Sequence, residues 1–172
     1  MVPAELERQI AQLHPASFAW ALACTRWNAA EAEEVLQSVY LRILDGRARF
    51  GGRSSFKTWL FGVVKNVAAE HRRRRWLEEL VPWRWGGATP PAEPSGGGPA
   101  EALESAQRGA RVRHALARLG ARQRQVLELV FFHQLTLEES AAVMGVALGT
   151  ARAHYHRGKL RLLALLEPED LR

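Results

Sequence analysis

The sequence predicts an all-α protein made of two small helical domains. Apolar residues recur three and four positions apart in both halves of the chain, and no stretch alternates with the two-residue period of a strand. Between the halves, residues 81–100 hold five prolines and five glycines without an apolar stripe, which is typical of a linker. We therefore expect one domain over 1–80, a flexible linker over 81–100 and a second domain over 101–172.

Three helices are expected in the N-terminal domain. Pro15 suits the first turn of a helix, and Asn28 with Glu31 forms a capping-box pattern at the start of a second helix. A third helix begins at Ser55. The apolar stripe of the second helix consists of Val35, Leu36, Val39, Tyr40, Ile43 and Leu44.

The C-terminal domain ends in the pattern of a helix-turn-helix. Thr136 and Glu139 form a capping box at the start of the first helix, Gly145 ends it, and Leu148 begins the second after a three-residue turn. Two further helices precede the motif. The leucines expected to bury the far end of the second motif helix are Leu160, Leu163 and Leu166.

Composition narrows the class of protein. The chain has no apolar run as long as a membrane span and no signal-peptide pattern, so we expect a cytoplasmic protein without membrane insertion of its own. Its single cysteine, Cys24, excludes an internal disulfide framework, and no cofactor or metal site is expected. The histidines have no carboxylate or cysteine partners at a spacing that suggests an active site, so the chain is not expected to be an enzyme.

The charge is unevenly distributed. Residues 1–41 hold two basic and five acidic side chains, whereas residues 42–84 hold eleven basic and four acidic ones. This separation predicts an acidic surface for a protein partner and a basic surface for nucleic acid. In the glycine-containing loop before Ser55, Phe50 is suited to stack on an unpaired base. In the second motif helix, Arg152 and Arg157 are suited to bind guanine edges or phosphates.

Two separate motifs resemble one protein family. The stretch A-E-E-V-L-Q at 32–37 is similar to A-E-D-L-V-Q, and residues 49–60 nearly match R-F-x-G-x-S-S-F-x-T-W-L. Later, A-L-A-R-L-G-A-R-Q-R-Q-V-L-E-L and G-T-A-R-A-H-Y-H-R are similar to L-P-x-x-x-R-x-V and G-T-V-K-S-R-L-H-R. With this order and this linker, the chain resembles the group 4, or extracytoplasmic-function (ECF), sigma factors of bacterial RNA polymerase, in the sigma-70 family.

The resemblance implies a sigma region 2 domain, a sigma region 4 domain and a role for each set of residues. Core RNA polymerase would be bound through the clamp of its largest subunit by Glu33, Glu34, Gln37, Tyr40, Leu41 and Arg42. The minus-10 element would be recognised and melted by Phe50, Arg53, Ser54, Ser55, Lys57, Lys65, Asn66, Arg72, Arg73, Arg74 and Arg75. The minus-35 element would be read by Thr150, Arg152, Ala153, His156 and Arg157. The polymerase flap and an anti-sigma factor are the further partners that the family implies.

The chain departs from the family pattern at several of these positions. Ala147 replaces the usual serine before the recognition helix, which removes a side-chain cap that typically contributes about 1 kcal/mol. Other departures change the promoter-reading and clamp-binding surfaces: Ser38, Arg53, Ala151, Ala153 and His154. These departures are expected to affect promoter preference and the clamp contact.

One alternative is a stand-alone helix-turn-helix transcriptional regulator. Such a regulator binds duplex DNA by itself, usually as a dimer on paired half-sites. The chain shows no obvious stripe for dimerisation. Strong binding of duplex DNA by the isolated chain would favour this alternative.

Overall fold

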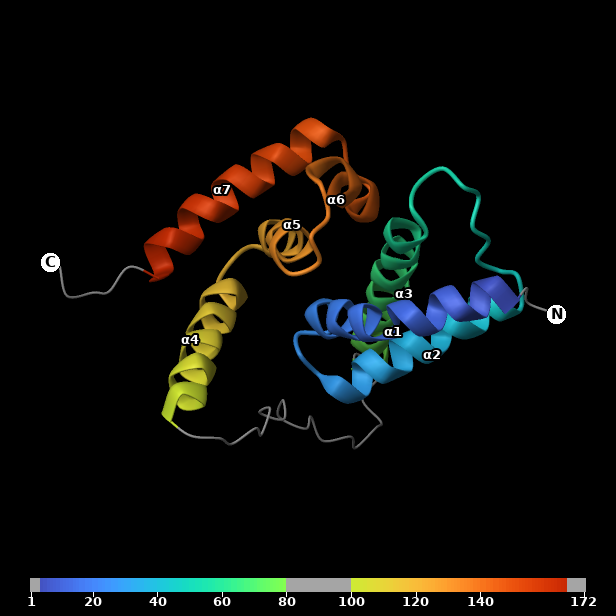
Figure 1. The fold of residues 1–172 in the computed structure, drawn as a ribbon, viewed down its shortest axis with the longest axis horizontal. Helices are drawn as coiled ribbons and strands as arrows, with labels where there is room; N and C mark the ends of the chain where they lie inside the picture. Colours follow the sequence, from blue (N-terminus) through green and yellow to red (C-terminus); the bar gives the residue numbers. More distant parts are fainter. Residues whose placement is uncertain (1–3, 80–99, 167–172) are drawn as a thin grey trace, which may run out of the picture. The chain divides into compact units, whose positions relative to one another are not determined.

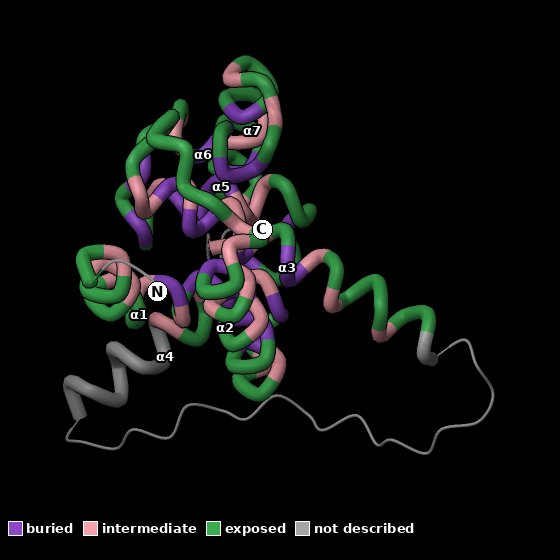
Figure 2. The backbone as a smooth tube through the Cα atoms, turned by 90° about the vertical axis from the view of Figure 1, so that its right-hand side faces the viewer, coloured by how far each residue is buried: buried purple, intermediate pink, exposed green. Residues whose placement is uncertain are grey.

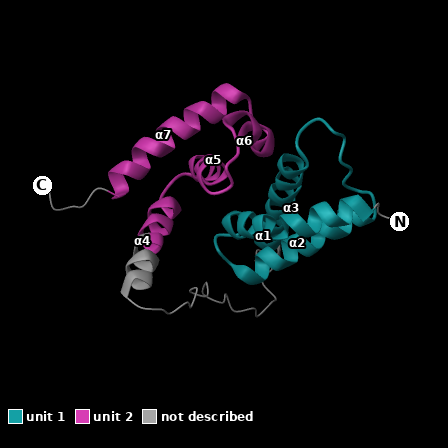
Figure 3. Ribbon diagram, viewed as in Figure 1, with its two compact units in different colours: residues 1–92 teal, residues 93–172 magenta. Residues whose placement is uncertain are grey.

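The structure, a computed structural model, describes residues 4–79 and 100–166, and its contacts divide the chain into two compact units, residues 1–92 and 93–172 (Figure 3). The described residues form seven helices and no strand (Figure 1), which confirms the all-α prediction. The linker expected over 81–100 lies outside the described residues except for Ala100, so its boundaries remain a prediction.

Unit 1 contains α1 (Ala4–Cys24), α2 (Ala29–Leu44) and α3 (Phe56–Glu79), and each of these helices packs against the other two. Trp20 lies at the centre of the core, where its indole N–H donates to the Phe61 carbonyl oxygen at 3.0 Å. Its ring stacks on that of Phe61 with a centroid distance of 6.0 Å. Buried and exposed positions alternate along each helix with the helical period (Figure 2), so one stripe of each faces the core.

The first helix differs from the sequence prediction, because it begins at Ala4 and continues through Pro15. Proline lacks the N–H that would bond the carbonyl four residues earlier, which here belongs to Ala11. Both Pro15 and Ala11 are exposed, so water can satisfy that carbonyl. Leu6, Ile10 and Leu13 are partly buried, so the apolar stripe extends ahead of the proline.

The start of α2 forms only half of the expected capping box. The Glu31 N–H donates to the Asn28 side-chain oxygen at 3.2 Å, as in a capped helix. The Glu31 carboxylate, however, accepts from the Asn28 side-chain amide at 3.0 Å and pairs with Arg75. The Asn28 backbone N–H instead donates to the Thr25 carbonyl oxygen at 3.2 Å. Glu31 therefore connects α2 to α3 instead of closing the box.

The predicted start of the third helix agrees with the structure to within one residue. The Ser55 hydroxyl accepts from the Thr58 N–H at 3.1 Å at the start of α3. Gly46, at a φ of +71°, follows the end of α2 in the left-handed region that favours glycine.

Unit 2 contains α4 (Ala100–Ala117), α5 (Ala121–Phe131), α6 (Leu137–Met144) and α7 (Leu148–Leu166). The helix-turn-helix is formed by α6 and α7. Its capping box is complete: the Glu139 N–H donates to the Thr136 hydroxyl at 3.1 Å, and the Thr136 N–H donates to the Glu139 carboxylate at 3.0 Å. Gly145 ends α6 at a φ of +66°, as predicted.

The far end of α7 packs through a different stripe from the one predicted. Leu160 and Leu163 are 56% and 52% exposed. The side chains that pack against the buried cluster of Leu116, Leu119 and Leu127 are Val112, Tyr155, Leu162 and Leu165. The stripe is determined by Gly158, which is buried where α7 crosses α5. A Cβ atom on Gly158 would lie 3.1 Å from the Gln123 Cβ, so only glycine permits this close approach without a shift.

Candidate nucleic-acid interface

The first half of α7 exposes the residues predicted to read DNA. Thr150, Arg152, Ala153, His156 and Arg157 are all exposed, whereas Ala151 between them is fully buried against the rest of unit 2. The five predicted residues therefore share an accessible surface on one helix, as entry into a groove requires.

The two arginines on this surface have intramolecular partners. The Arg152 guanidinium lies 3.2 Å from the Glu138 carboxylate of α6, and the Arg157 Nε donates to the Ala153 carbonyl oxygen at 3.2 Å. Both members of the Arg152–Glu138 pair are 61% exposed, and an ion pair of such exposure contributes little stability. Either arginine can therefore exchange its partner for a phosphate or a base edge at low cost.

His154 replaces an arginine of the family pattern and lies half-buried beside this surface. Desolvation by burial is the largest cause that lowers its pKa, followed by the positive charges of Arg157 and Arg122. The imidazole is therefore neutral near pH 7 and contributes no cation for DNA binding. Arg122, on α5, is near enough to influence His154, although no motif in the sequence indicated a role for it.

In unit 1, the loop between α2 and α3 holds Phe50 against two other rings. The Phe50 ring is 42% exposed and meets Phe56 edge-on at a centroid distance of 5.4 Å. It also lies 5.5 Å from the Trp59 ring. Phe50 is thus not the freely exposed ring that the sequence suggested, but the exposed edge of a three-ring cluster anchored on α3. Its remaining exposed surface is still accessible to a planar partner.

The polar residues predicted around Phe50 lie in the loop before α3 or along the first three turns of that helix. Arg53, Ser54 and Ser55 are exposed in the loop, and Asn66 is exposed three turns along α3. Lys65 is half-buried, and the Lys57 ammonium lies 5.7 Å from the centre of the Phe61 ring.

The arginine run at the end of α3 divides into two groups. Arg72, Arg73 and Arg74 are exposed, as a role in phosphate binding requires. Arg75 is different, because it pairs with Glu31 of α2. Two further contacts join the same helices: an ion pair between Arg42 and Glu70 at 2.6 Å, and a hydrogen bond between the His71 Nε2 and the Glu34 carboxylate at 2.9 Å. The hydrogen bond from Arg42 is the largest cause that lowers the pKa of Glu70.

These pairs also divide the predicted polymerase-binding face of α2. Glu33, Glu34, Gln37 and Leu41 are exposed, whereas Arg42 turns toward α3 and the Tyr40 hydroxyl lies 2.9 Å from the His14 Nδ1 of α1. Glu34 contacts His71, and the exposed residues Glu33, Gln37 and Leu41 form a stripe along the outer face of the helix. The sequence pattern predicted Leu44 in the core, but it is 52% exposed and extends this stripe by one turn.

Neither a metal centre nor a membrane span is found in the described parts of the chain. Within residues 4–79 and 100–166, no three His, Cys, Asp or Glu side chains gather as metal ligands. Across the same residues, no helix combines the length and apolar character needed to cross a membrane.

Comparison with known proteins identifies the two units. Residues 10–78 match the family model of Sigma-70 region 2, and residues 109–162 match that of Sigma-70, region 4. The class of protein that this fold and these exposed surfaces define is therefore a sigma-70 type transcription initiation factor, which binds core RNA polymerase and promoter DNA.

Relatives place the chain more narrowly within that class. The ECF RNA polymerase sigma factor SigC of Mycobacterium tuberculosis is 31% identical over 152 residues, which cover 88% of this chain and 79% of that protein. The ECF RNA polymerase sigma factor RpoE of Cereibacter sphaeroides is 34% identical over 126 residues, which cover 73% and 66%. The chain belongs to the extracytoplasmic-function sigma factors of the sigma-70 family.

A solved structure shares the fold. The sigma factor RpoE of Bartonella quintana, determined in complex with the anti-sigma factor NepR, matches with a TM-score of 0.71 and 24% sequence identity. The match covers 96% of this chain and 98% of that chain.

Proposed function

We propose that the two units perform separate parts of promoter recognition. Unit 1 binds the largest-subunit clamp of the polymerase and opens the minus-10 element, while unit 2 reads the minus-35 element and contacts the flap. The observation that carries this proposal is the exposure of the promoter-reading residues in both units: Phe50, Arg53, Asn66, Thr150, Arg152 and Arg157. In this role the protein acts in the cytoplasm as a binding factor and not as an enzyme.

The clamp contact is assigned to the exposed stripe of α2. Glu33, Gln37 and Leu41 lie four residues apart and so project from one face of the helix. An apolar side chain beside acidic and amide groups suits a protein partner, with Leu41 contributing buried area and the carboxylates selecting a basic surface. Tyr40 and Arg42 support the stripe from its two sides through His14 and Glu70.

Melting is assigned to the loop before α3 and the first three turns of that helix. Removing a base from the stack costs a few kcal/mol, which a pocket with aromatic and polar partners must offset. The exposed edge of Phe50 offers a stacking surface that is already fixed by Phe56 and Trp59. Asn66 can hydrogen-bond the extruded base, and the exposed arginines Arg72 to Arg74 can neutralise the adjacent backbone.

Regulation by an anti-sigma factor is also proposed. It is supported by the fold shared with the Bartonella quintana RpoE, which was determined with its anti-sigma factor NepR. Co-purification of the full-length protein from its native cell is expected to recover such a partner, and recovery of core polymerase alone would contradict this part of the proposal.

The decisive experiment measures promoter opening by core polymerase with the full-length protein, through permanganate reactivity of unpaired thymines. Phe50→Ala and Asn66→Ala are expected to reduce opening more than initial recruitment, whereas Arg157→Ala reduces recruitment through the minus-35 element. Arg8→Ala, which removes an exposed arginine at the start of α1, is the control. Equal effects of all three site variants on both steps would contradict the division of labour, and tight binding of duplex DNA without polymerase would favour a stand-alone regulator.

A further inference from the structure

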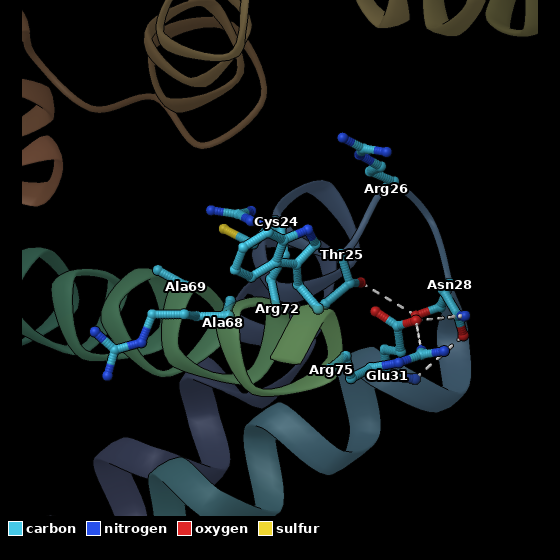
Figure 4. A pocket seen from close by; sticks show the side chains of 11 residues that line it. Cys24, Thr25, Arg26, Asn28, Glu31, Ala68, Ala69, Arg72 and Arg75 are labelled. Atoms are coloured by element: carbon cyan, nitrogen blue, oxygen red, sulfur yellow. Dashed lines mark hydrogen bonds and ion pairs between the residues drawn. The ribbon is translucent and has the colours of Figure 1, made fainter. Parts of the chain in front are cut away.

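Unit 1 contains a cavity of which the proposed minus-10 contacts use only two lining residues, Arg72 and Arg73. Its volume is about 810 Å³, and it lies between the turn that joins α1 to α2 and the second half of α3 (Figure 4). Cavities of several hundred cubic ångströms are large enough for a small-molecule ligand. Cys24, Thr25 and Arg26 line it from the turn, and Arg72 and Trp76 line it from α3. We call it the cationic cavity.

The lining carries a surplus of positive charge. Four arginines line the cavity, at positions 26, 72, 73 and 75, and the one carboxylate among the lining residues is that of Glu31. Glu31 already neutralises Arg75, whereas Glu70, whose pKa Arg73 also helps to lower, is paired with Arg42. Arg26, Arg72 and Arg73 carry the remaining surplus. Guanidinium groups bind phosphate through paired, charge-assisted hydrogen bonds, so the cavity favours a phosphorylated ligand.

An aromatic ring is available beside these arginines. Trp76 lines the cavity and is 59% exposed, although most of a tryptophan side chain is usually buried. Its flat face can stack on a nucleobase, and an arginine can pack over the same ring. A plain inorganic anion would leave this surface uncovered, whereas a nucleotide would use both the charge and the ring.

The turn that presents Arg26 is held in an unusual backbone conformation. Arg26 and Trp27 have φ values of 55° and 66°, in the left-handed region that side chains other than glycine rarely adopt. Hydrogen bonds hold the turn in place: the Trp27 N–H donates to the Leu22 carbonyl oxygen at 2.8 Å, and the Thr25 hydroxyl lies 2.9 Å from the Ala21 carbonyl oxygen. Backbone strain of this kind persists where the surroundings over-determine it, and it is concentrated at functional sites.

We propose that the cationic cavity binds a phosphorylated nucleotide, with its phosphates on Arg26 and Arg72 and its base against Trp76. The same chemistry is offered by a free nucleotide and by a nucleotide unit of a single strand. The site shares Arg72 with the phosphate contacts proposed above for the minus-10 element, but the α1–α2 turn and Trp76 belong to the cavity alone. The Arg26 and Trp76 variants therefore test the cavity separately from promoter binding.

Cys24 makes the proposal directly testable, because it is the single cysteine of the chain and lines the cavity. The rate of its alkylation by iodoacetamide in the folded full-length protein reports whether the cavity is filled. The probes are ATP, a 5′-phosphorylated single-stranded pentanucleotide and inorganic pyrophosphate. At least one of the nucleotide probes is expected to slow alkylation in a saturable way, at concentrations about tenfold below those that pyrophosphate requires, because only the nucleotides add a stacked base.

Variants connect the protection to the proposed residues. Arg26→Ala and Arg72→Ala are each expected to weaken protection about tenfold, and Trp76→Ala similarly, whereas Trp76→Phe retains a stacking ring and stays within about threefold. Arg74→Ala is the matched control, because it removes the same charge from the same run without lining the cavity. The nucleotide probe that protects at the lower concentration identifies the source of the ligand. No protection by either nucleotide, equal protection by pyrophosphate, or unchanged protection in the Arg26 and Arg72 variants would overturn the proposal.

Discussion

Glu128 is a carboxylic acid buried in the interior of unit 2. Its side chain, on α5, is 3% exposed, and neither carboxylate oxygen has a hydrogen-bond partner in the structure. Burial raises the pKa of this group to about 7, and the positive charge of Arg124 opposes the shift only in part. A buried charge without a hydrogen-bonded partner is costly, so the neutral acid is the form that the fold favours.

This burial predicts that unit 2 loses stability as the pH rises. The folded protein binds the Glu128 proton more tightly than the unfolded chain, so stability is greatest below pH 4.5 with respect to this group and falls through pH 7. Glu128→Gln cannot ionise and is expected to increase the free energy of unfolding at pH 8 by up to about 3 kcal/mol. Denaturant titrations between pH 5 and 8 measure the effect.

Glu138→Gln, at an exposed carboxylate of the same unit, is the control. An unchanged pH dependence in the Glu128 variant would contradict the prediction.

The Glu138 carboxylate, 3.2 Å from the Arg152 guanidinium, is expected to compete with DNA for that arginine. Glu138→Gln is expected to raise the affinity of the holoenzyme for minus-35 DNA about two- to threefold, since an exposed pair contributes roughly 0.2–1 kcal/mol. Equilibrium binding to a promoter fragment measures this gain. In an Arg152→Ala background the same substitution should give no gain. A gain that persists there would mean that Glu138 simply repels DNA.

At the scale of the helix, substitutions at two glycines of α7 are expected to change the stability of the protein in opposite directions. A Cβ atom on Gly149 would enter open space, with no packing neighbour within 4 Å, whereas Gly158 is pressed against Gln123 and Leu127. Gly149→Ala is therefore expected to stabilise the protein by up to about 1 kcal/mol, through helix propensity alone. Gly158→Val is expected to destabilise it by about 1–3 kcal/mol, through overpacking where α7 crosses α5. Thermal unfolding of the two variants tests the assignment, and equal shifts of the same sign would contradict it.

Elements whose signals are local could be predicted from the sequence, and elements that depend on a partner helix could not. The Thr136–Glu139 capping box and the Gly145 stop involve neighbouring residues only, and both were predicted. The packing stripe of α7 was not, because positions 160, 163 and 166 fit the helical period as well as positions 155, 162 and 165 do. Contact with α5 at Gly158 decides between these stripes.

The same reasoning applies to the candidate site. Residue type and motif were sufficient to predict which stretches of α2, α3 and α7 are exposed. Sequence could not show that Arg75 pairs with Glu31 or Arg42 with Glu70, because these ion pairs join residues 44 and 28 positions apart. It also missed the cationic cavity, since Arg26 and Trp76 are 50 residues apart and line one cavity only because the second half of α3 lies beside the α1–α2 turn.

At the scale of the whole molecule, the proposed promoter-reading surfaces are divided between the two units, whereas the acidic and basic stretches both lie in unit 1. The acidic stretch of residues 1–41 contains the exposed stripe of α2, and the basic stretch that follows contains the minus-10 residues. The minus-35 residues lie in the other unit, on a helix with no side-chain cap at Ala147. We expect each of the two proposed DNA surfaces to bind only modestly by itself. Joining the two raises the effective concentration of the second surface once the first is bound.

This arrangement predicts that damage to the two surfaces adds in free energy. Asn66→Ala in unit 1 and Arg157→Ala in unit 2 share no contact and lie in separate units. The loss of promoter binding in the double variant should equal the sum of the single losses to within about 0.5 kcal/mol, as expected for distant sites. The double-mutant cycle compares the wild type, the two single variants and the double variant. For each, the affinity of the holoenzyme for one promoter is measured at one salt concentration. The comparison pair is Lys57→Ala with Asn66→Ala. Both residues lie in unit 1, so the hypothesis does not require their effects to add. A coupling well above about 0.5 kcal/mol between Asn66 and Arg157 would mean that the units read the promoter as one body.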